Sequence, residues 1–302
     1  MRLYVLLVVA WVALLAAFGW GGLPAAADRN ANCVDLEGLA AQYANGHSVP
    51  IGMLRVPLGR CDRNLALIGL AETAVRVGNI SDSLLVMDLL QSGSEQLSPN
   101  KSEKLQAAQV RSQLAESYLR SKQDQPALAE WAEALEFEPD YLPALLGKGE
   151  TLGRVGRIQE GAQTLLDAAN LYPSDGSVWA ALASFYLDDA AEPLVAARYA
   201  KVSIILDARN VQALRVLTIF SQSFSRCGDA VQYGERWVQV APDDYWAWLE
   251  LANASWSCGE HASASLAYNR FLELAPVDVR EQYREYVRAR LSPDHQPNAE
   301  TH

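Results

Sequence analysis

Residues 243–276 read DDYWAWLELANASWSCGEHASASLAYNRFLELAP, and this stretch decides the fold. Small and large apolar residues recur at helical spacing on both sides of Gly259, and the stretch ends at Pro276, which cannot continue a helix. Prolines at matching places upstream lie 34, 69 and 34 residues apart, at Pro139, Pro173, Pro242 and Pro276. A period of 34 residues, with one extra residue in the middle interval, therefore predicts a stack of helical hairpins.

The same alternation of large and small residues returns within each period. The first helix of a period carries a large residue, a leucine, a small residue and often a tyrosine, and the second carries small and aromatic residues before the proline. The small residue of the first helix is found at Ala115, Gly149, Ala183 and Ala252. Small residues at these places let two antiparallel helices approach closely, while the large ones fill the space between neighbouring hairpins.

This pattern resembles the tetratricopeptide repeat (TPR) family, whose unit is a helix–turn–helix of 34 residues. The resemblance implies an all-α fold, an α-solenoid of helical hairpins with a C-terminal capping helix. Five repeats are expected at 108–141, 142–175, 176–210, 211–244 and 245–278, after a degenerate helical repeat and linker at 63–107. With the capping helix the solenoid spans residues 108–291, and the polar tail at 292–302 is expected to be disordered.

The N-terminus has the character of an export signal. Arg2 is the only charged side chain among residues 1–27, and an apolar run from Leu3 to Phe18 is followed by glycines, a proline and small residues. A signal peptide cleaved after Ala27 fits this pattern. An uncleaved membrane anchor also fits, because about 25 uncharged residues can cross about 30 Å of hydrocarbon. Both interpretations predict an extracytoplasmic protein, periplasmic or at the surface of a bacterial envelope.

Export favours disulfides over free thiols. Cys33 and Cys61 lie together in the segment at 28–62, and Cys227 and Cys258 lie together far downstream. Four thiols allow three pairings, and we expect these two local pairs. A zinc site needs closer ligand spacing, such as CxxC or HxxxH, and neither occurs. No metal or other cofactor is therefore expected.

Composition argues against nucleic-acid binding and against catalysis. The formal net charge is −11, and no run of Lys or Arg occurs, so a phosphate backbone would be repelled. No motif for nucleophilic, phosphate-binding or metal chemistry is present, and two of the four histidines lie in the polar tail. The sequence therefore predicts a binding protein and not an enzyme.

The resemblance implies that the inner face of the stack forms a groove for a protein or peptide partner. In the fifth repeat the groove positions are Trp246, Leu249, Asn253 and Trp256, and indoles around an amide suit an extended peptide. The alternative is that the capping helix folds over this face and buries both indoles.

The same groove positions in other repeats hold Arg120, Arg154 and Arg215. They predict a broken basic track, unless these arginines are solvated partners of nearby Glu116 and Glu150.

Because members of the family recruit peptides or assemble complexes, the implied function is that of an exported scaffold for protein–protein interaction at the cell envelope. The alternative function is an accessory subunit of an envelope enzyme system, in glycan or pilus assembly, whose repeats present substrate.

Overall fold

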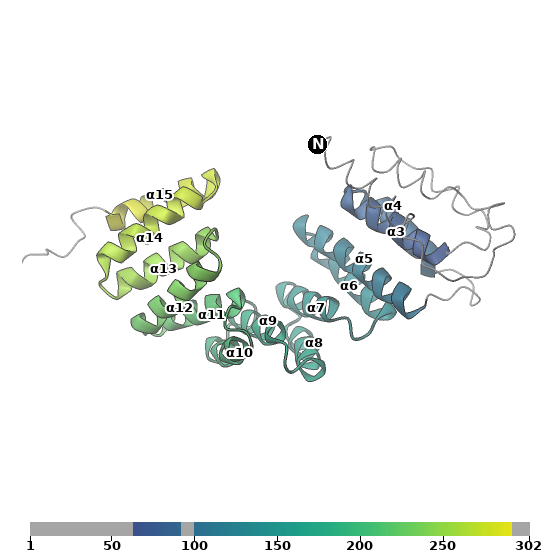
Figure 1. The fold of residues 1–302 in the computed structure, drawn as a ribbon, viewed down its shortest axis with the longest axis horizontal. Helices are drawn as coiled ribbons and strands as arrows, with labels where there is room; N and C mark the ends of the chain where they lie inside the picture. The colour runs from purple at the N-terminus through teal and green to yellow at the C-terminus, as the bar shows by residue number, and fades with distance from the viewer. Residues whose placement is uncertain (1–62, 92–99, 292–302) are drawn as a thin grey trace, which may run out of the picture. The chain divides into compact units, whose positions relative to one another are not determined.

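The computed structural model describes residues 63–91 and 100–291, and these residues form α-helices without any strand. Thirteen helices in this described part follow one another as six hairpins and a last single helix (Figure 1). The predicted fold class, an all-α solenoid of TPR-like hairpins ending in a further helix, is confirmed. The chain divides into two compact units within α7, one up to Ala144 and one from Leu145 onward.

The first unit contains two hairpins, formed by α3 (Arg63–Arg76) and α4 (Ile80–Gln91), and by α5 (Lys101–Arg120) and α6 (Asp124–Phe137). Most of α7 (Leu142–Arg154) belongs to the second unit, which continues with α8 (Ile158–Leu171), α9 (Gly176–Asp188), α10 (Pro193–Leu206), α11 (Val211–Ser223), α12 (Cys227–Val240), α13 (Tyr245–Ser257), α14 (His261–Leu274) and α15 (Val277–Leu291).

Each hairpin turns at a residue with a left-handed backbone. The φ angle is +81° at Gly156 and +79° at Gly259. Three other hairpins make the same turn with Lys122, Ala191 and Ser225, at φ angles of 58°, 55° and 54°. A side chain at such a φ is strained, so the repeat imposes the turn even where glycine is missing.

Glycine inside the helices serves close packing. A Cβ atom added to Gly149 of α7 would lie 2.5 Å from Cγ of Leu165, and one added to Gly161 of α8 would lie 2.8 Å from the carbonyl oxygen of Gly149. Both contacts are too short for any side chain, so these two helices cross at a distance that only glycine permits.

Two tryptophans each form a hydrogen bond from the first helix of a repeat to the turn that precedes it. The indole N–H of Trp179 donates to the carbonyl oxygen of Pro173 over 2.8 Å, and Trp248 makes the same bond to Pro242. Trp248, the middle tryptophan of the stretch that decides the fold, therefore has a structural role.

A buried ion pair joins three helices of the first unit. Arg111 of α5 is 2% exposed and donates to Oε2 of Glu130 in α6 over 2.9 Å and to Oε1 of Gln91 in α4 over 3.0 Å. Burial raises the pKa of the Glu130 carboxyl, and the nearby guanidinium of Arg111 only partly offsets this. No sequence pattern indicated that Arg111 would be buried.

The helix α5 begins at Lys101, seven residues before the expected start of the first repeat. Asn100 caps it, because its side chain accepts from the backbone N–H of Glu103 while the Glu103 carboxylate accepts from the backbone N–H of Asn100.

The predicted export segment (1–27), the segment 28–62 with Cys33 and Cys61, and the tail (292–302) lie outside the described residues. Within the described ranges, none of the helices has the length and apolar character needed to span a bilayer.

Candidate partner-binding face

Side chains from successive first helices meet on one face of the second unit. Arg215 of α11 pairs with Asp188 at the end of α9, and its Nη1 lies 3.3 Å from Oδ1 of that carboxylate. Gln222 of α11 donates to the backbone carbonyl of Glu250 in α13 over 2.8 Å. We call the surface formed by these residues, together with Glu150 of α7 and Trp246 of α13, the inner face.

Carboxylates outnumber cations on the inner face, and the environments of Glu150 and Glu250 disfavour ionisation of these two carboxyls. Burial raises the pKa of Glu150, repulsion from Asp189 adds to this rise, and Arg154 and Arg215 counteract it. The pKa of Glu250 is also raised by burial and is lowered in part by hydrogen bonds and by Arg215. The inner face therefore holds carboxyls that a cationic group of a partner would help to ionise.

The arginines predicted as a basic track each have a carboxylate neighbour. Arg215 is paired with Asp188, and Arg154 interacts with Glu150. Arg120 belongs to the first unit, where its side chain is 69% exposed and lies 4.0 Å from the carboxylate of Glu116. Arg120 and Arg154 thus lie beside Glu116 and Glu150, the neighbours named in the alternative, whereas Arg215 is half-buried and pairs with Asp188.

The helix α15 contacts the groove positions of the fifth repeat. Asn253 Oδ1 accepts hydrogen bonds from the hydroxyls of Tyr268, over 2.8 Å, and of Tyr286 in α15, over 2.7 Å. Trp246 remains 38% exposed although its ring meets the edge of Tyr283, with ring centroids 5.6 Å apart. Trp246 is therefore the fifth-repeat aromatic that a partner can reach with least rearrangement.

The groove predictions for Leu249 and Trp256 have different outcomes from that for Trp246. Leu249 is 2% exposed and belongs to the core cluster that includes Val287 of α15, so its expected place in an open groove is wrong. Trp256 is half-buried and packs edge-to-face on His261, with centroids 4.5 Å apart. Leu249 lies in one apolar cluster with side chains of α12, α14 and α15, and this packing across helices accounts for its burial.

Sequence reasoning missed the polar contacts of α15. Arg290 lies over the ring of Tyr286, with its guanidinium carbon 3.6 Å from the ring centroid. The spacing of Val279, Tyr283, Tyr286 and Val287 predicts the packing side of this helix. No sequence pattern connected the hydroxyl of Tyr286 to Asn253.

One predicted disulfide lies beside this face. Cys227, the first residue of α12, is bonded to Cys258, the residue that caps α13, and their Cα atoms are 5.2 Å apart. The bond joins the fourth and fifth repeats, as the local pairing predicted. The Cys33–Cys61 pairing stays a prediction.

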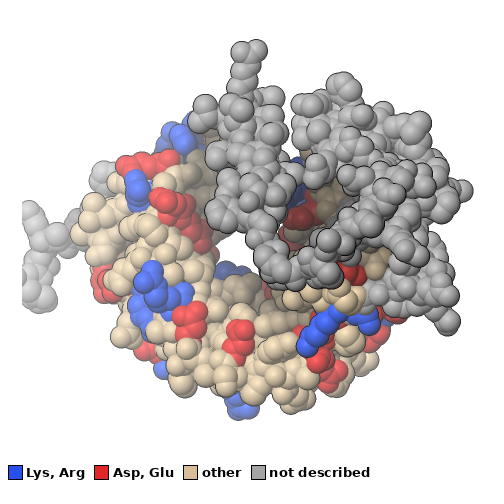
Figure 2. All heavy atoms as spheres, turned by 45° about the vertical axis from the view of Figure 1, so that its right-hand side comes forward, with Lys and Arg blue, Asp and Glu red and all other residues tan. Residues whose placement is uncertain are grey.

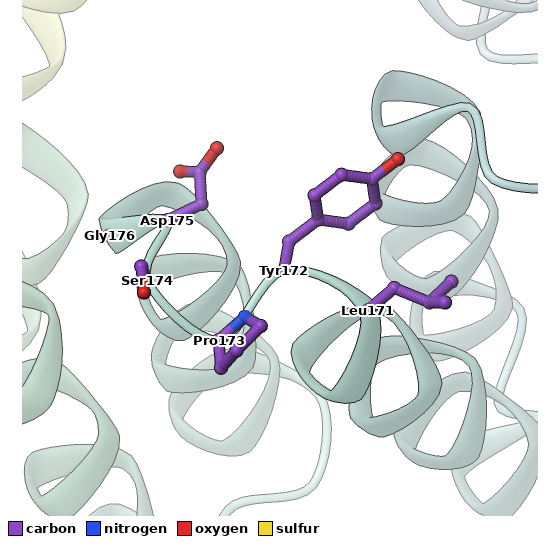
Figure 3. Close-up of a pocket in the computed structure, with 6 residues that line it drawn as sticks. All are labelled: Leu171, Tyr172, Pro173, Ser174, Asp175 and Gly176. Carbon is purple, nitrogen blue, oxygen red and sulfur yellow. The ribbon is translucent and has the colours of Figure 1, made fainter.

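An open depression of about 540 Å³ lies between α8 and α9 and is lined by the consecutive residues Leu171 to Gly176 (Figure 3). Tyr172 and Asp175 project to one side of this loop, whereas Pro173 points to the other (Figure 3). Asp175 is its sole carboxylate, and its side chain accepts from the backbone N–H of Ser177 as the N-cap of α9. The depression therefore offers a capped helix start and no arrangement for acid–base chemistry.

Charge is mixed on the surface that can be seen. In the view of Figure 2, basic and acidic side chains lie interspersed, without one continuous patch of either sign. Across the described residues, no cluster of three or more His, Cys, Asp or Glu could hold a metal ion.

Comparison with known proteins finds likeness at the level of structure. No family model and no curated protein matches the sequence. A tetratricopeptide repeat protein from Parabacteroides merdae superposes with a TM-score of 0.57 at 12% identity, covering 76% of this chain and 87% of that one. PilF of Pseudomonas aeruginosa superposes with a TM-score of 0.56 at 19% identity, covering 76% of this chain and 99% of PilF. PilW, a "widely conserved type IV pilus biogenesis factor", superposes with a TM-score of 0.51 at 18% identity, covering 63% of this chain and 97% of PilW. At such identities the likeness shows the fold.

Proposed function

We propose that this chain is an exported scaffold that binds a segment of a protein partner on the inner face of its second unit. The observation that carries the proposal is the set of contacts linking α9, α11 and α13, which fixes charged groups and the exposed Trp246 on one surface. TPR-like folds serve mainly as binding scaffolds, which supports this class of function over catalysis.

The chemistry of the inner face suits a partner segment that carries both an apolar and a cationic side chain. An indole gives a large contact area at low entropic cost, so Trp246 is the anchor. A cation near Glu150 and Glu250 would stabilise the charged form of carboxyls whose pKa burial has raised. Gln222 and Arg215 bridge first helices, so they keep the spacing between these points fixed.

The test compares Trp246→Ala with Leu266→Ala, which truncates an exposed leucine of α14 that lies outside the inner face. Crosslinking mass spectrometry on native membranes first identifies the partner. We expect Trp246→Ala to weaken its binding about tenfold or more, as loss of a hot-spot aromatic does, and Leu266→Ala to leave it unchanged. Equal affinities for wild type and Trp246→Ala, with the melting temperature preserved, would rule out the inner face as the binding site.

Export is proposed on the strength of residues 1–27 alone. N-terminal sequencing of the protein from its native cells gives the test. A mature chain that starts at Asp28 supports a cleaved signal, and an intact Met1 in the membrane fraction supports an anchor. An intact Met1 in the soluble cytoplasmic fraction would contradict both.

A second candidate function is that of an accessory subunit in an envelope assembly system that presents substrate along the repeats. The fold likeness to PilW, a type IV pilus biogenesis factor, favours this candidate. Copurification with an envelope enzyme or pilus component, sensitive to Trp246→Ala, would distinguish it from a scaffold whose partner has no such role.

A further inference from the structure

The helix α10 exposes an apolar stripe that its own fold leaves uncovered. Ile205 is 81% exposed and Leu194 is 59% exposed, and Val202 and Leu206 are exposed as well. Arg198 and Lys201 lie between them and are also exposed. Steps of three and four residues place side chains on the same side of a helix. These residues therefore form one surface, which we call the α10 stripe: Leu194, Arg198, Lys201, Val202, Ile205 and Leu206.

The stripe is not a general consequence of the repeat. The equivalent helix α12 exposes polar side chains, including Gln232, Glu235 and Gln239, and α14 exposes one large apolar residue, Leu266. Isolated exposed apolar residues are ordinary, whereas several on one helix face mark an interaction surface.

The helix that carries the stripe is held firmly from its other side. Ala196, Ala197 and Ala200 are buried, and the buried hydroxyl of Ser203 donates to the carbonyl oxygen of Gly176 over 2.8 Å. The first turn is preset by Pro193. The stripe is therefore a preorganised surface, about 18 Å long from Leu194 to Leu206 at 1.5 Å per residue, which matches three turns of a partner helix.

Charge decides what covers the stripe. The range Pro193–Leu206 contains two basic residues and no acidic one, although the whole chain carries a net charge of −11. A second copy docked antiparallel, with Leu194 on the copy's Ile205, would bring Arg198 beside the copy's Lys201, so like charges would meet at the centre. A stripe of this sign is instead complementary to an acidic partner.

A broad anionic bilayer fits less well than a narrow partner. Exposed carboxylates flank the stripe at both ends, at Glu192 before the helix and Asp207 after it. A flat membrane surface would contact them together with the basic residues, whereas one helix laid along α10 would contact the stripe alone.

We propose that the α10 stripe docks an amphipathic helix of another protein, one that carries acidic residues among large apolar residues at helical spacing. This surface is distinct from the inner face, whose residues lie on first helices. The scaffold thus has two docking surfaces, one for the segment bound on the inner face and one for a helix on α10.

Site-specific photocrosslinking tests the proposal in the full chain expressed in its native cells. The photoreactive residue benzoylphenylalanine replaces Ile205, and in a matched control it replaces the isolated Leu266 of α14. We expect position 205 to crosslink to another protein, at a segment whose acidic and apolar residues alternate with helical period. The double substitution Arg198→Glu, Lys201→Glu should lower that yield about tenfold or more, because it makes the stripe repel an acidic helix.

Both substituted side chains are exposed, so an unchanged melting temperature establishes that the charge-reversed chain is folded. Trp246→Ala should leave the yield at position 205 unchanged, which separates this surface from the inner face. Crosslinks to a second copy, to lipid or to a segment without acidic residues would overturn the proposal. So would a yield at position 205 no higher than at position 266, or one that charge reversal leaves intact.

Discussion

At the scale of single residues, the hairpin turns show how the repeat constrains the backbone. Nothing lies within 4 Å of a Cβ atom added to Gly156, so only its φ of +81° opposes a side chain there. We expect Gly156→Ala to lower the free energy of unfolding by about 1 kcal/mol. Ala191→Gly, at a φ of 55°, should raise it by about 0.5 kcal/mol. Urea unfolding measures both, and equal destabilisation by the two changes would contradict a backbone cause.

The buried pair of Arg111 and Glu130 makes a second test at this scale. Their side chains are 2% and 9% exposed, so removal of one partner leaves a buried charge uncompensated. Arg111→Met should cost about 3–5 kcal/mol, and the double variant Arg111→Met, Glu130→Met should recover most of that loss. Chemical unfolding of the two single variants and the double variant gives the coupling free energy. Additive losses would mean that the pair is not coupled.

Glu150 predicts a dependence of stability on pH. Its pKa is raised in the folded chain, so the folded state binds the proton more tightly than the unfolded state does. The stability that this proton contributes is complete below the unfolded pKa of about 4.3 and is lost as pH rises through the raised folded value. The melting temperature of Glu150→Gln should therefore equal that of wild type near pH 4 and exceed it at pH 8. The exposed Glu235→Gln is the control, and a constant offset at all pH values would contradict the prediction.

At the scale of elements, the disulfide joins the hairpins of the fourth and fifth repeats. Cys227 and Cys258 are 31 residues apart in sequence. A loop of this length gives a stabilisation of about 3–4 kcal/mol on the chain-entropy estimate. Reductant should therefore lower the melting temperature of wild type, while the variant Cys227→Ser, Cys258→Ser should start lower and not respond. An equal response of both proteins would assign the effect to another bond.

The sequence determined the hairpins better than it determined the inner face. Proline spacing and small residues such as Gly149 report on local turns and on close helix packing, and each is found at four matching places along the chain, so chance matches are rare. Burial of Leu249 depends on the apolar cluster that several helices build around it, and the pairing of Arg215 with Asp188 depends on how adjacent hairpins align. Such contacts join residues in different hairpins and occur once, so no periodic signal marks them.

At the scale of the whole chain, stability in a stack of hairpins is local, because each hairpin contacts mainly its neighbours. The disulfide lies at the junction of α12 and α13, whereas α5 and α6 belong to the other compact unit and have their own core and ion pair. Reduction of this disulfide should therefore leave the stability of the first unit unchanged.

Hydrogen exchange measured by mass spectrometry, with and without reductant, tests this locality. We expect reduction to lower protection in α11 to α14, because the constraint on their unfolded forms is lost, and to leave α5 and α6 unchanged. The Cys227→Ser, Cys258→Ser variant should reproduce the reduced pattern without reductant. An equal loss of protection in α5 and α6 would show that the chain unfolds as one cooperative body, and nearest-neighbour contacts would then not account for its stability.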